Sequence, residues 1–291
     1  MTVTVFDSRS CILGEGPLWH PLRQQLFWFD IVNCKLLSRL GGRPLEWQFE
    51  RHVSAAGWID HGNLLVASET GLSRFNLETG TEEMLCPIEA DRKATRSNDG
   101  RADPWGGFWI GTMGKAGEPE LGTLYRWAHG ELRIVETGLT TPNAVCFDGD
   151  RACAYYSDTK TRIVWRRPLD PQTGWPAGAK EVFLDLRARE TEPEHKPDGA
   201  VVDAEGCLWS AQWGSARVAR YSPCGKFLQA LDLPTGHATC PAFGGPDFTT
   251  LFVTSATQKL PEEAVEWRQT AGQTFALKSP VHGRPEPQVQ T

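Results

Sequence analysis

The chain has 291 residues, of which 40% are hydrophobic and 23% are charged, and its formal net charge is −6. These fractions are typical of a globular protein with an apolar core. A nucleic-acid-binding surface needs clustered lysine and arginine, and no basic block occurs, so nucleic acid is excluded as an expected partner.

The chain also lacks the features of a membrane or exported protein. No apolar run approaches the roughly 20 residues that a membrane helix needs, and the first seven residues lack the basic start and apolar stretch of a signal peptide. We therefore expect a cytoplasmic protein without a membrane partner. The eight cysteines form no CxxC motif or Cys/His cluster, which favours reduced, mostly buried thiols over a disulfide framework or a zinc site.

A strand-like aromatic or aliphatic motif recurs six times along the chain. The motifs, in order, are Leu26–Phe29, Leu64–Ala67, Phe108–Gly111, Ala154–Ser157, Leu208–Ala211 and Leu251–Thr254. Their central residues, listed as markers, are Trp28, Val66, Trp109, Tyr156, Trp209 and Phe252. The markers are spaced by about 45 residues, which is typical of the blades of a β-propeller.

The residues around the motifs support this interpretation. Turn signals rich in Gly, Asp, Asn and Pro precede the motifs, as in Asp103–Gly107 and Asp203–Gly206. Most motifs lead into a second alternating strand, and long helical periodicity is absent. The sequence therefore predicts an all-β, six-bladed β-propeller that fills residues 1–291 as a single domain. A pair of β-sandwiches is the alternative.

A propeller ring closes when strands from the two termini share a blade, because an open ring would expose sheet edges. Residues 2–6 alternate like a strand, and we expect them to pair beside residues 274–277.

The repeats also predict which residues meet on the propeller axis. The innermost strand of each blade runs along the central channel, so residues at equivalent positions near its start should surround one mouth. Counting back about 11 to 13 residues from each marker gives Glu15, Ser54, Asn98, Asn143, Asp198 and Cys240.

Four of these six positions carry a carboxylate or a carboxamide, although strands disfavour Asp and Asn. Glu15, Asn143 and Asp198 are each flanked by Gly or Pro, which suits a sharp entry into a strand. Alone, each would be interpreted as an Asx-turn or a solvated strand end. Together, converging oxygens require a positive charge between them, and their shared phase predicts a site for one divalent cation.

The motifs around these positions resemble those of the gluconolactonase/regucalcin family of sugar lactonases. The likeness runs nearly the full chain. The segments that carry it are Gly14–Trp19, Arg96–Gly100, Trp109–Met113, Gly138–Asn143, Tyr156–Thr159, Pro197–Asp203 and Cys240–Asp247, the last being similar to the final blade of bacterial aldonolactonases. The resemblance implies a six-bladed propeller with metal ligands at Glu15, Asn143 and Asp198 and substrate contacts at Arg96 and Asn98.

The sequence departs from the family pattern at two places. The family often has Gly after the ligand Asn, where this chain has Ala144. Regucalcin-like members have an acidic pair after Gly-Thr-Met, with one Glu touching substrate, where this chain has Gly114–Ala116. We expect Glu118 to supply a substrate contact from a shifted loop. This second departure affects the choice of substrate more than the type of reaction.

We therefore expect metal-dependent hydrolysis of an aldonolactone to the aldonic acid. The metal would polarise the lactone carbonyl, and Asp198 would act as a general base or position the water. Oxygen ligands favour Ca²⁺, Mg²⁺ or Mn²⁺, with Fe²⁺ and Zn²⁺ open. The alternatives are a calcium-binding regulator without turnover and a propeller interaction scaffold.

One further segment is expected to bear on substrate choice. The charged segment from Arg187 to His195 is expected to overhang the site and to influence substrate preference. The sequence predicts neither the particular sugar nor the oligomeric state.

Overall fold

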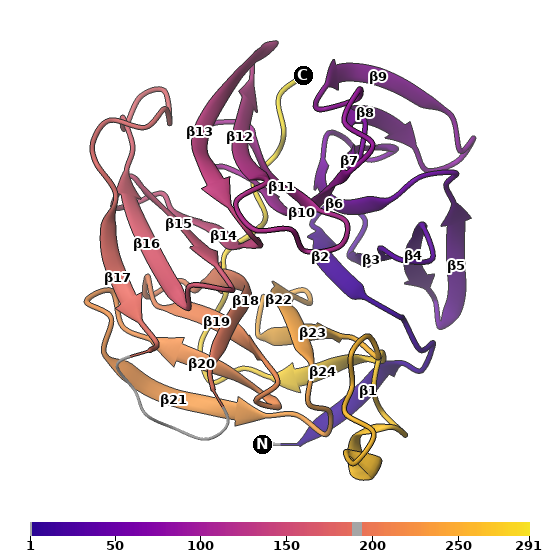
Figure 1. The fold of residues 1–291 in the computed structure, drawn as a ribbon. Coiled ribbons are helices and arrows are strands. Elements are labelled where there is room, and N and C mark those ends of the chain that lie inside the picture. The colour runs from indigo at the N-terminus through magenta and orange to yellow at the C-terminus, as the bar shows by residue number, and fades with distance from the viewer. Residues whose placement is uncertain (1, 188–193) are drawn as a thin grey trace.

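The computed structural model, which describes residues 2–187 and 194–291, consists of six four-stranded antiparallel sheets. The sheets surround a central axis like the blades of a propeller (Figure 1). Contacts between the first strands of successive sheets close the ring, because β2 contacts both β6 and β22. The predicted six-bladed propeller is confirmed, and the alternative of paired sandwiches is wrong.

The strands of the blades follow one another in chain order, from the axis outward. The first three blades contain β2 (Gly14–His20), β3 (Gln25–Asp30), β4 (Lys35–Leu40) and β5 (Arg43–Gln48); β6 (Val53–Trp58), β7 (Asn63–Ser68), β8 (Gly71–Asn76) and β9 (Glu82–Pro87); and β10 (Thr95–Ala102), β11 (Phe108–Gly114), β12 (Gly122–Ala128) and β13 (Glu131–Leu139). Blades 4 and 5 contain β14 (Pro142–Asp148), β15 (Cys153–Asp158), β16 (Ile163–Pro168) and β17 (Glu181–Asp185); and β18 (Lys196–Val202), β19 (Leu208–Trp213), β20 (Arg217–Tyr221) and β21 (Phe227–Asp232).

The sixth blade joins the two ends of the chain. It contains β22 (Ala238–Gly244), β23 (Thr250–Ser255), β24 (Thr274–Lys278) and, on the outside, β1 (Val3–Asp7). β1 and β24 are antiparallel, with Val3 opposite Leu277 and Val5 opposite Phe275. The expected closure by N- and C-terminal strands is therefore confirmed, and it pairs the edge that β24 would otherwise leave open.

The repeated motifs of the sequence form the second strand of every blade. All six marker residues are buried, and five of them have no exposed surface. Alternate side chains of these strands pack into the apolar layers between neighbouring blades, as the two-residue period of a strand requires. The sequence repeat therefore reports packing between blades, which is why it has the same phase throughout.

Buried aspartates fix the turns that lead into two of these strands. Asp103 accepts hydrogen bonds from two backbone N–H groups of its own turn and from Nε1 of Trp109. Asp203 makes the same set of contacts with its turn and with Trp209. An arginine on the third strand of each blade completes the arrangement by pairing with the carboxylate. Each aspartate thus satisfies buried donors from several strands of its blade.

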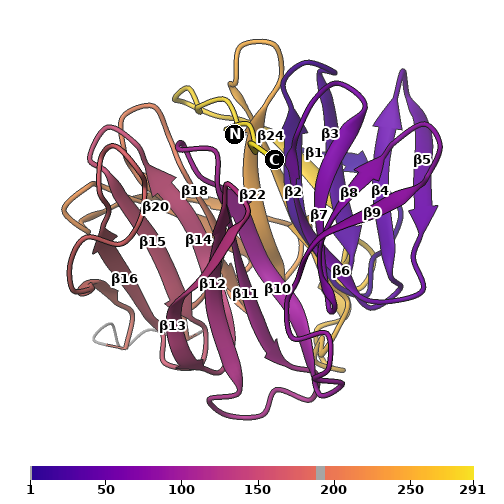
Figure 2. The same cartoon turned by 90° about the horizontal axis from the view of Figure 1, so that it is seen from above.

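The C-terminal segment after β24 crosses the ring close to its axis (Figures 1 and 2). Its backbone carbonyl at His282 accepts a hydrogen bond from Ala204 of blade 5. Farther along, Trp58 of blade 2 donates its indole N–H to the carbonyl of Glu286, at 2.7 Å, and accepts a hydrogen bond from the N–H of Val289. The segment is therefore attached to blades on both sides of the axis.

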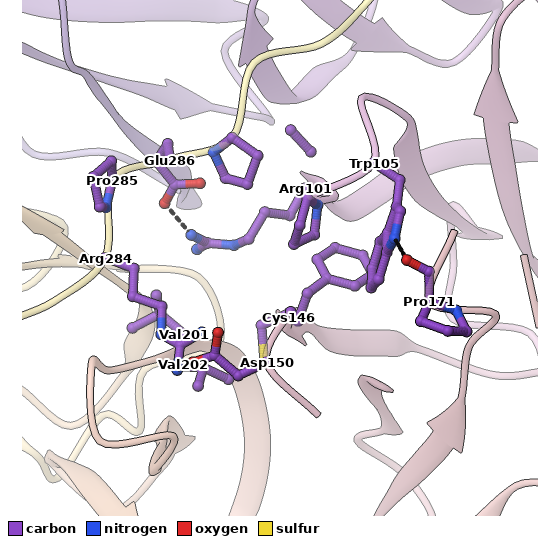
Figure 3. A pocket seen from close by; sticks show the side chains of 15 residues that line it. Arg101, Trp105, Cys146, Asp150, Pro171, Val201, Val202, Arg284, Pro285 and Glu286 are labelled. Carbon is purple, nitrogen blue, oxygen red and sulfur yellow. Dashed lines mark hydrogen bonds and ion pairs between the residues drawn. The ribbon is translucent and has the colours of Figure 1, made fainter. Parts of the chain in front are cut away.

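A buried ion pair lies where this segment crosses the channel. Glu286 and Arg101 pair directly, and their side chains are 6% and 9% exposed (Figure 3). Arg101 also donates to the carbonyl of Pro241 on β22. The pair borders a cavity of about 460 Å³ lined by the C-terminal ends of inner strands, including Cys146 and Val202. This mouth of the channel is thus closed by opposite charges that satisfy each other.

The remaining structure contains little besides strands. One short 3₁₀ helix, η1 (Val265–Trp267), precedes β24. In residues 2–187 and 194–291, no helix has the length and apolar character needed to cross a bilayer. The eight cysteines are unpaired in the structure, and six of them are buried, while Cys34 is partly buried and Cys224 is exposed. The expectation that most cysteines are buried is confirmed.

We predict that Glu286→Ala destabilises the protein by about 3–5 kcal/mol, because it leaves the Arg101 guanidinium buried without its partner. Urea-induced unfolding measures the change, and Glu262→Ala, at an exposed carboxylate, is the matched control. The double variant Arg101→Met/Glu286→Met should recover most of the loss. A decrease of less than about 1 kcal/mol for Glu286→Ala would show that the pair does not hold this end of the channel.

Candidate metal and substrate site

A second cavity, of about 520 Å³, lies at the opposite mouth of the channel. Five residues predicted from the sequence line it: Glu15, Arg96, Asn98, Asn143 and Asp198. They come from the starts of β2, β10, β14 and β18, which belong to four different blades. The propeller thus brings together side chains that are up to 183 positions apart in the chain.

A β-bulge occurs at this point in the inner strands. On each of five inner strands, an interval of three residues pairs with an interval of only two residues on the neighbouring strand. The affected intervals are Glu15–Leu18, Ser97–Gly100, Asn143–Cys146, Pro197–Ala200 and Ala238–Pro241. A bulge interrupts the alternation of side chains and redirects them, so it turns polar groups toward the cavity within otherwise apolar strands.

The residues that follow two of the candidate ligands adopt left-handed backbone conformations. Gly16 has φ = +54°, and a Cβ there would lie 2.3 Å from the carbonyl oxygen of Ser54. Ala144 has φ = +57° and is fully buried. Ala144 is the first of the two departures from the family pattern, and its left-handed conformation explains why Gly is usual at this position, since Gly adopts it without strain. Ala144 keeps the bulge geometry despite its side chain.

Glu15 and Asp198 form the acidic centre of the site. Each is 5% exposed, and their side chains hydrogen-bond to each other. Burial raises the pKa of Glu15 to about 8, with a further contribution from the nearby Asp99. Burial, followed by the charges of Glu15 and Asp99, also raises the pKa of Asp198 well above its usual range. The cluster therefore resists carrying its full negative charge unless a cation compensates it.

A hydrogen-bond network orients Asn143 beside this centre. Its Oδ1 accepts from Nδ2 of Asn98 at 3.0 Å, and its Nδ2 donates to Oγ1 of Thr159 at 2.8 Å. Thr159 in turn donates to the carbonyl of Pro197, at 2.7 Å. The network links three blades. It also fixes the orientation of the Asn143 amide, because Oδ1 must face the donor Asn98 and Nδ2 must face the acceptor Thr159. A carbonyl oxygen has two lone pairs, so Oδ1 retains one for a further partner.

Arg96 covers the same network from β10. One guanidinium nitrogen donates to Oδ1 of Asn98 and to the carbonyl of Ser97, both at 2.8 Å. Burial lowers the pKa of Arg96 to about 10, against the attraction of Glu15 and Glu69. The side chain remains a cation at neutral pH and places donor groups at the cavity wall.

Three other predicted positions lie outside the cavity wall. Ser54 and Cys240 occupy the equivalent phase on β6 and β22 but are fully buried, with Ser54 donating to Ser97. Glu118 is exposed, and its carboxylate accepts a hydrogen bond from the N–H of Ala116. Glu118 itself does not line the cavity, although Lys115, Ala116 and Gly117 just before it do.

Several wall residues had no role assigned from the sequence. Thr159 could have been identified from the sequence, because it ends the Tyr156–Thr159 motif. It lies two residues after Ser157, which pairs with Asn143. Four more lie on loops, where strand phase gives no information: Lys115, Lys160, Arg162 and Lys259. Lys196 and Trp213 lie at the start of β18 and at the end of β19. In the segment that was expected to overhang the site, residues 188–193 lie outside the described residues.

The donor set suits a hard cation. Two carboxylates and one amide oxygen are ligands of the kind that Ca²⁺, Mg²⁺ and Mn²⁺ prefer. Within the described parts of the chain, no three His, Cys, Asp or Glu residues are grouped to hold a metal ion. The third oxygen of this set belongs to Asn143, which is not one of those residue types.

Comparison with known proteins places this geometry in a family. Residues 13–257 match the model of the SMP-30/Gluconolactonase/LRE-like region. The chain belongs to this family. The match contains Glu15, Arg96, Asn98, Asn143 and Asp198, and it confirms the resemblance found in the sequence.

Individual relatives cover nearly the whole chain. A 6-deoxy-6-sulfogluconolactonase from Pseudomonas putida is 35% identical, covering 95% of this chain and 94% of its own. A pentonolactonase from Haloferax volcanii is also 35% identical, covering 98% and 97%. A solved structure of regucalcin from Agrobacterium tumefaciens, described as a calcium-binding protein, has a TM-score of 0.93 and 37% identity, covering 99% and 97%.

The raised pKa values predict how the metal-free protein responds to pH. Glu15 holds its proton up to about pH 8 in the folded state, whereas an unfolded glutamate loses it near 4.3. The folded state therefore binds more protons, and its stability falls as pH rises through this window. For EDTA-treated protein we expect a loss of about 1–3 kcal/mol between pH 6 and pH 8.

Asp198→Asn is the comparison variant for this pH dependence, since it removes one carboxylate and keeps the shape. It should be more stable than the EDTA-treated wild type at pH 8 and should show a shallower pH dependence. Urea unfolding at both pH values provides the measurement. Equal slopes for the two proteins would mean that the acidic centre does not determine the pH response.

Proposed function

We propose that this protein hydrolyses a sugar lactone to the corresponding aldonic acid, with one divalent cation held by Glu15, Asn143 and Asp198. The convergence of these three side chains from different blades on one cavity carries the proposal. Family membership and relatives whose names describe lactonases support the reaction type. Regucalcin, described as calcium-binding, supports the divalent cation.

The acidic centre fits a cation on physical grounds. Glu15 and Asp198 are buried carboxylates that hydrogen-bond to each other. Their raised pKa values indicate that the surrounding positive charge is too small to compensate two negative charges. A divalent ion would replace the shared proton and compensate both charges. Three protein ligands leave coordination positions open, which suits a site that also receives water and substrate.

Hydrolysis of a lactone adds water to the ring carbonyl, breaks the ring C–O bond and returns a proton to the ring oxygen. A bound cation would polarise the carbonyl and stabilise the developing negative charge. We infer that Asp198 holds the attacking water and receives its proton. Because a carboxylate that binds a cation is a weak base, holding the water is the larger part of this role.

Arg96 and Asn98 are the proposed substrate contacts. Arg96 offers guanidinium donors that are not used by Asn98 and Ser97, and guanidinium donors suit hydroxyl and carbonyl oxygens of a sugar. Asn98 links Arg96 to Asn143, so substrate binding and cation binding share one network. Glu118 is not included in this set, because its carboxylate is turned to its own loop.

We predict that Asp198→Ala lowers kcat for an aldonolactone at least 100-fold, because it removes both a cation ligand and the group that holds water. Dialysis of the wild type against EDTA should abolish turnover, and Ca²⁺, Mg²⁺, Mn²⁺, Zn²⁺ or Fe²⁺ should be compared for its restoration. Ring opening is followed by the release of acid across a panel of aldonolactones.

Two controls separate the enzyme from the alternatives. Circular dichroism and urea unfolding establish that Asp198→Ala is folded, and Asp247→Ala changes an aspartate in an exposed turn. Tight cation binding without turnover of any aldonolactone would favour a calcium-binding regulator. Undiminished turnover after removal of all divalent cations would contradict the proposed mechanism.

A further prediction concerns Thr159, which holds the amide of Asn143 in place. Thr159→Val keeps the shape but removes the hydroxyl that accepts from Asn143 and donates to Pro197. We expect cation affinity to fall about 10–100-fold, as is typical when a ligand loses its orienting partner. Isothermal titration calorimetry measures the affinity, and Thr81→Val on an exposed turn is the control. An affinity within twofold of the wild type would exclude this orienting role.

A further inference from the structure

Cationic side chains dominate the wall of the proposed active site, in contrast to the rest of the chain. The whole sequence has 36 Asp and Glu against 30 Lys and Arg. Among the described residues that line the cavity, the balance is reversed. Its carboxylates are Glu15, Glu194 and Asp198, and its cations are Arg96, Lys115, Lys160, Arg162, Lys196 and Lys259. The local excess of positive charge therefore belongs to the cavity and not to the protein surface in general.

Some of these cations are already paired. Lys115 contacts Glu69 at 2.7 Å, while Arg162 and Lys196 both contact Glu194, at 3.1 and 3.6 Å. One glutamate thus serves two cations. The Lys115–Glu69 pair is neutral overall, whereas the single negative charge of Glu194 cannot compensate both Arg162 and Lys196.

Lys160 and Lys259 differ from this group. Both are exposed and line the cavity, and neither forms an ion pair among residues 2–187 and 194–291. Lys160 follows β15 in blade 4, and Lys259 follows β23 in blade 6. Lys196, at the start of β18, belongs to blade 5 between them. The three lysines therefore form an arc over three consecutive blades, which we call the cationic arc.

The acidic centre cannot account for the cationic arc. Glu15 and Asp198 line the cavity but are largely buried, and they hydrogen-bond to each other. In the proposed function they bind a divalent cation, which removes their attraction for lysine and adds positive charge. A neutral sugar lactone offers only hydroxyl and ether oxygens and would leave the arc without a charged partner.

We propose that the natural substrate is a sugar lactone that carries a fixed anionic substituent, a sulfonate or a phosphate, held by Lys160, Lys196 and Lys259. This inference rests on the proposed lactonase function and specifies its substrate class. In this arrangement the cationic arc binds the anionic group of the substrate, and the lactone carbonyl of the same molecule faces the acidic centre. A tetrahedral anion presents three oxygens, which suits donors that approach from three blades.

The test compares two lactones that differ in one charged group, glucono-1,5-lactone and its 6-phosphate. We expect kcat/KM to be at least tenfold higher for the 6-phosphate at low ionic strength, with the preference decreasing as salt is added. Lys160→Gln/Lys259→Gln should reduce the ratio of the two kcat/KM values about tenfold. The control Lys226→Gln/Lys278→Gln changes exposed lysines away from the cavity and should leave the ratio unaltered.

A binding experiment without turnover keeps this inference separate from the proposed function. Sorbitol 6-phosphate and sorbitol, which have no lactone ring, are titrated into EDTA-treated protein by calorimetry. Tighter binding of sorbitol 6-phosphate that is lost in Lys160→Gln/Lys259→Gln supports the cationic arc even if no lactone is hydrolysed, in which case the proposed function fails. Hydrolysis of the neutral lactone with equal or higher kcat/KM than the 6-phosphate, or equal binding of the two sorbitols, overturns the arc and leaves lactonase function standing.

Discussion

The burial of two carboxylates at the propeller axis is the constraint around which the rest of the site is arranged. Glu15 and Asp198 come from blades 1 and 5, and each is almost fully removed from solvent. Like charges in such a position would separate if the scaffold allowed it. Closure of the ring by β1 and β24 prevents the blades from moving apart. The same closure that stabilises the fold therefore keeps the acidic centre in a state that favours a cation.

Much of the fold was predictable because one physical requirement repeats six times. Every blade must bury its second strand against its neighbours, so Trp28, Trp109 and Trp209 recur with a common phase. That phase also identifies Glu15 and Asp198, because inner strands of equal position begin at the same mouth of the channel. The sequence therefore predicts the carboxylate and carboxamide side chains that line the site from the inner strands.

The parts that were not predictable depend on loops and on local breaks in the strands. Gly16 suggests one bulge, but Ala144 gives no signal for its left-handed conformation. Lys160 and Lys259 follow strands in the chain, and nothing in their local sequence indicates that they meet at one cavity. The expected role of Glu118 was inferred at a loop where the chain departs from the family pattern, and in the structure its carboxylate accepts a hydrogen bond from the N–H of Ala116 in the same loop. Loop conformation depends on contacts that a strand repeat does not encode.

The two mouths of the channel show how one scaffold separates a structural task from a chemical one. At one end, Arg101 and Glu286 have opposite charges and satisfy each other in a buried pair. At the other, Glu15 and Asp198 are both acids, and their burial next to each other raises the pKa of each, so the two cannot readily ionise together. A satisfied pair resists change and suits a closure. In the proposed function a cation compensates the acidic pair, so that mouth is the one at which we expect the chemistry to occur.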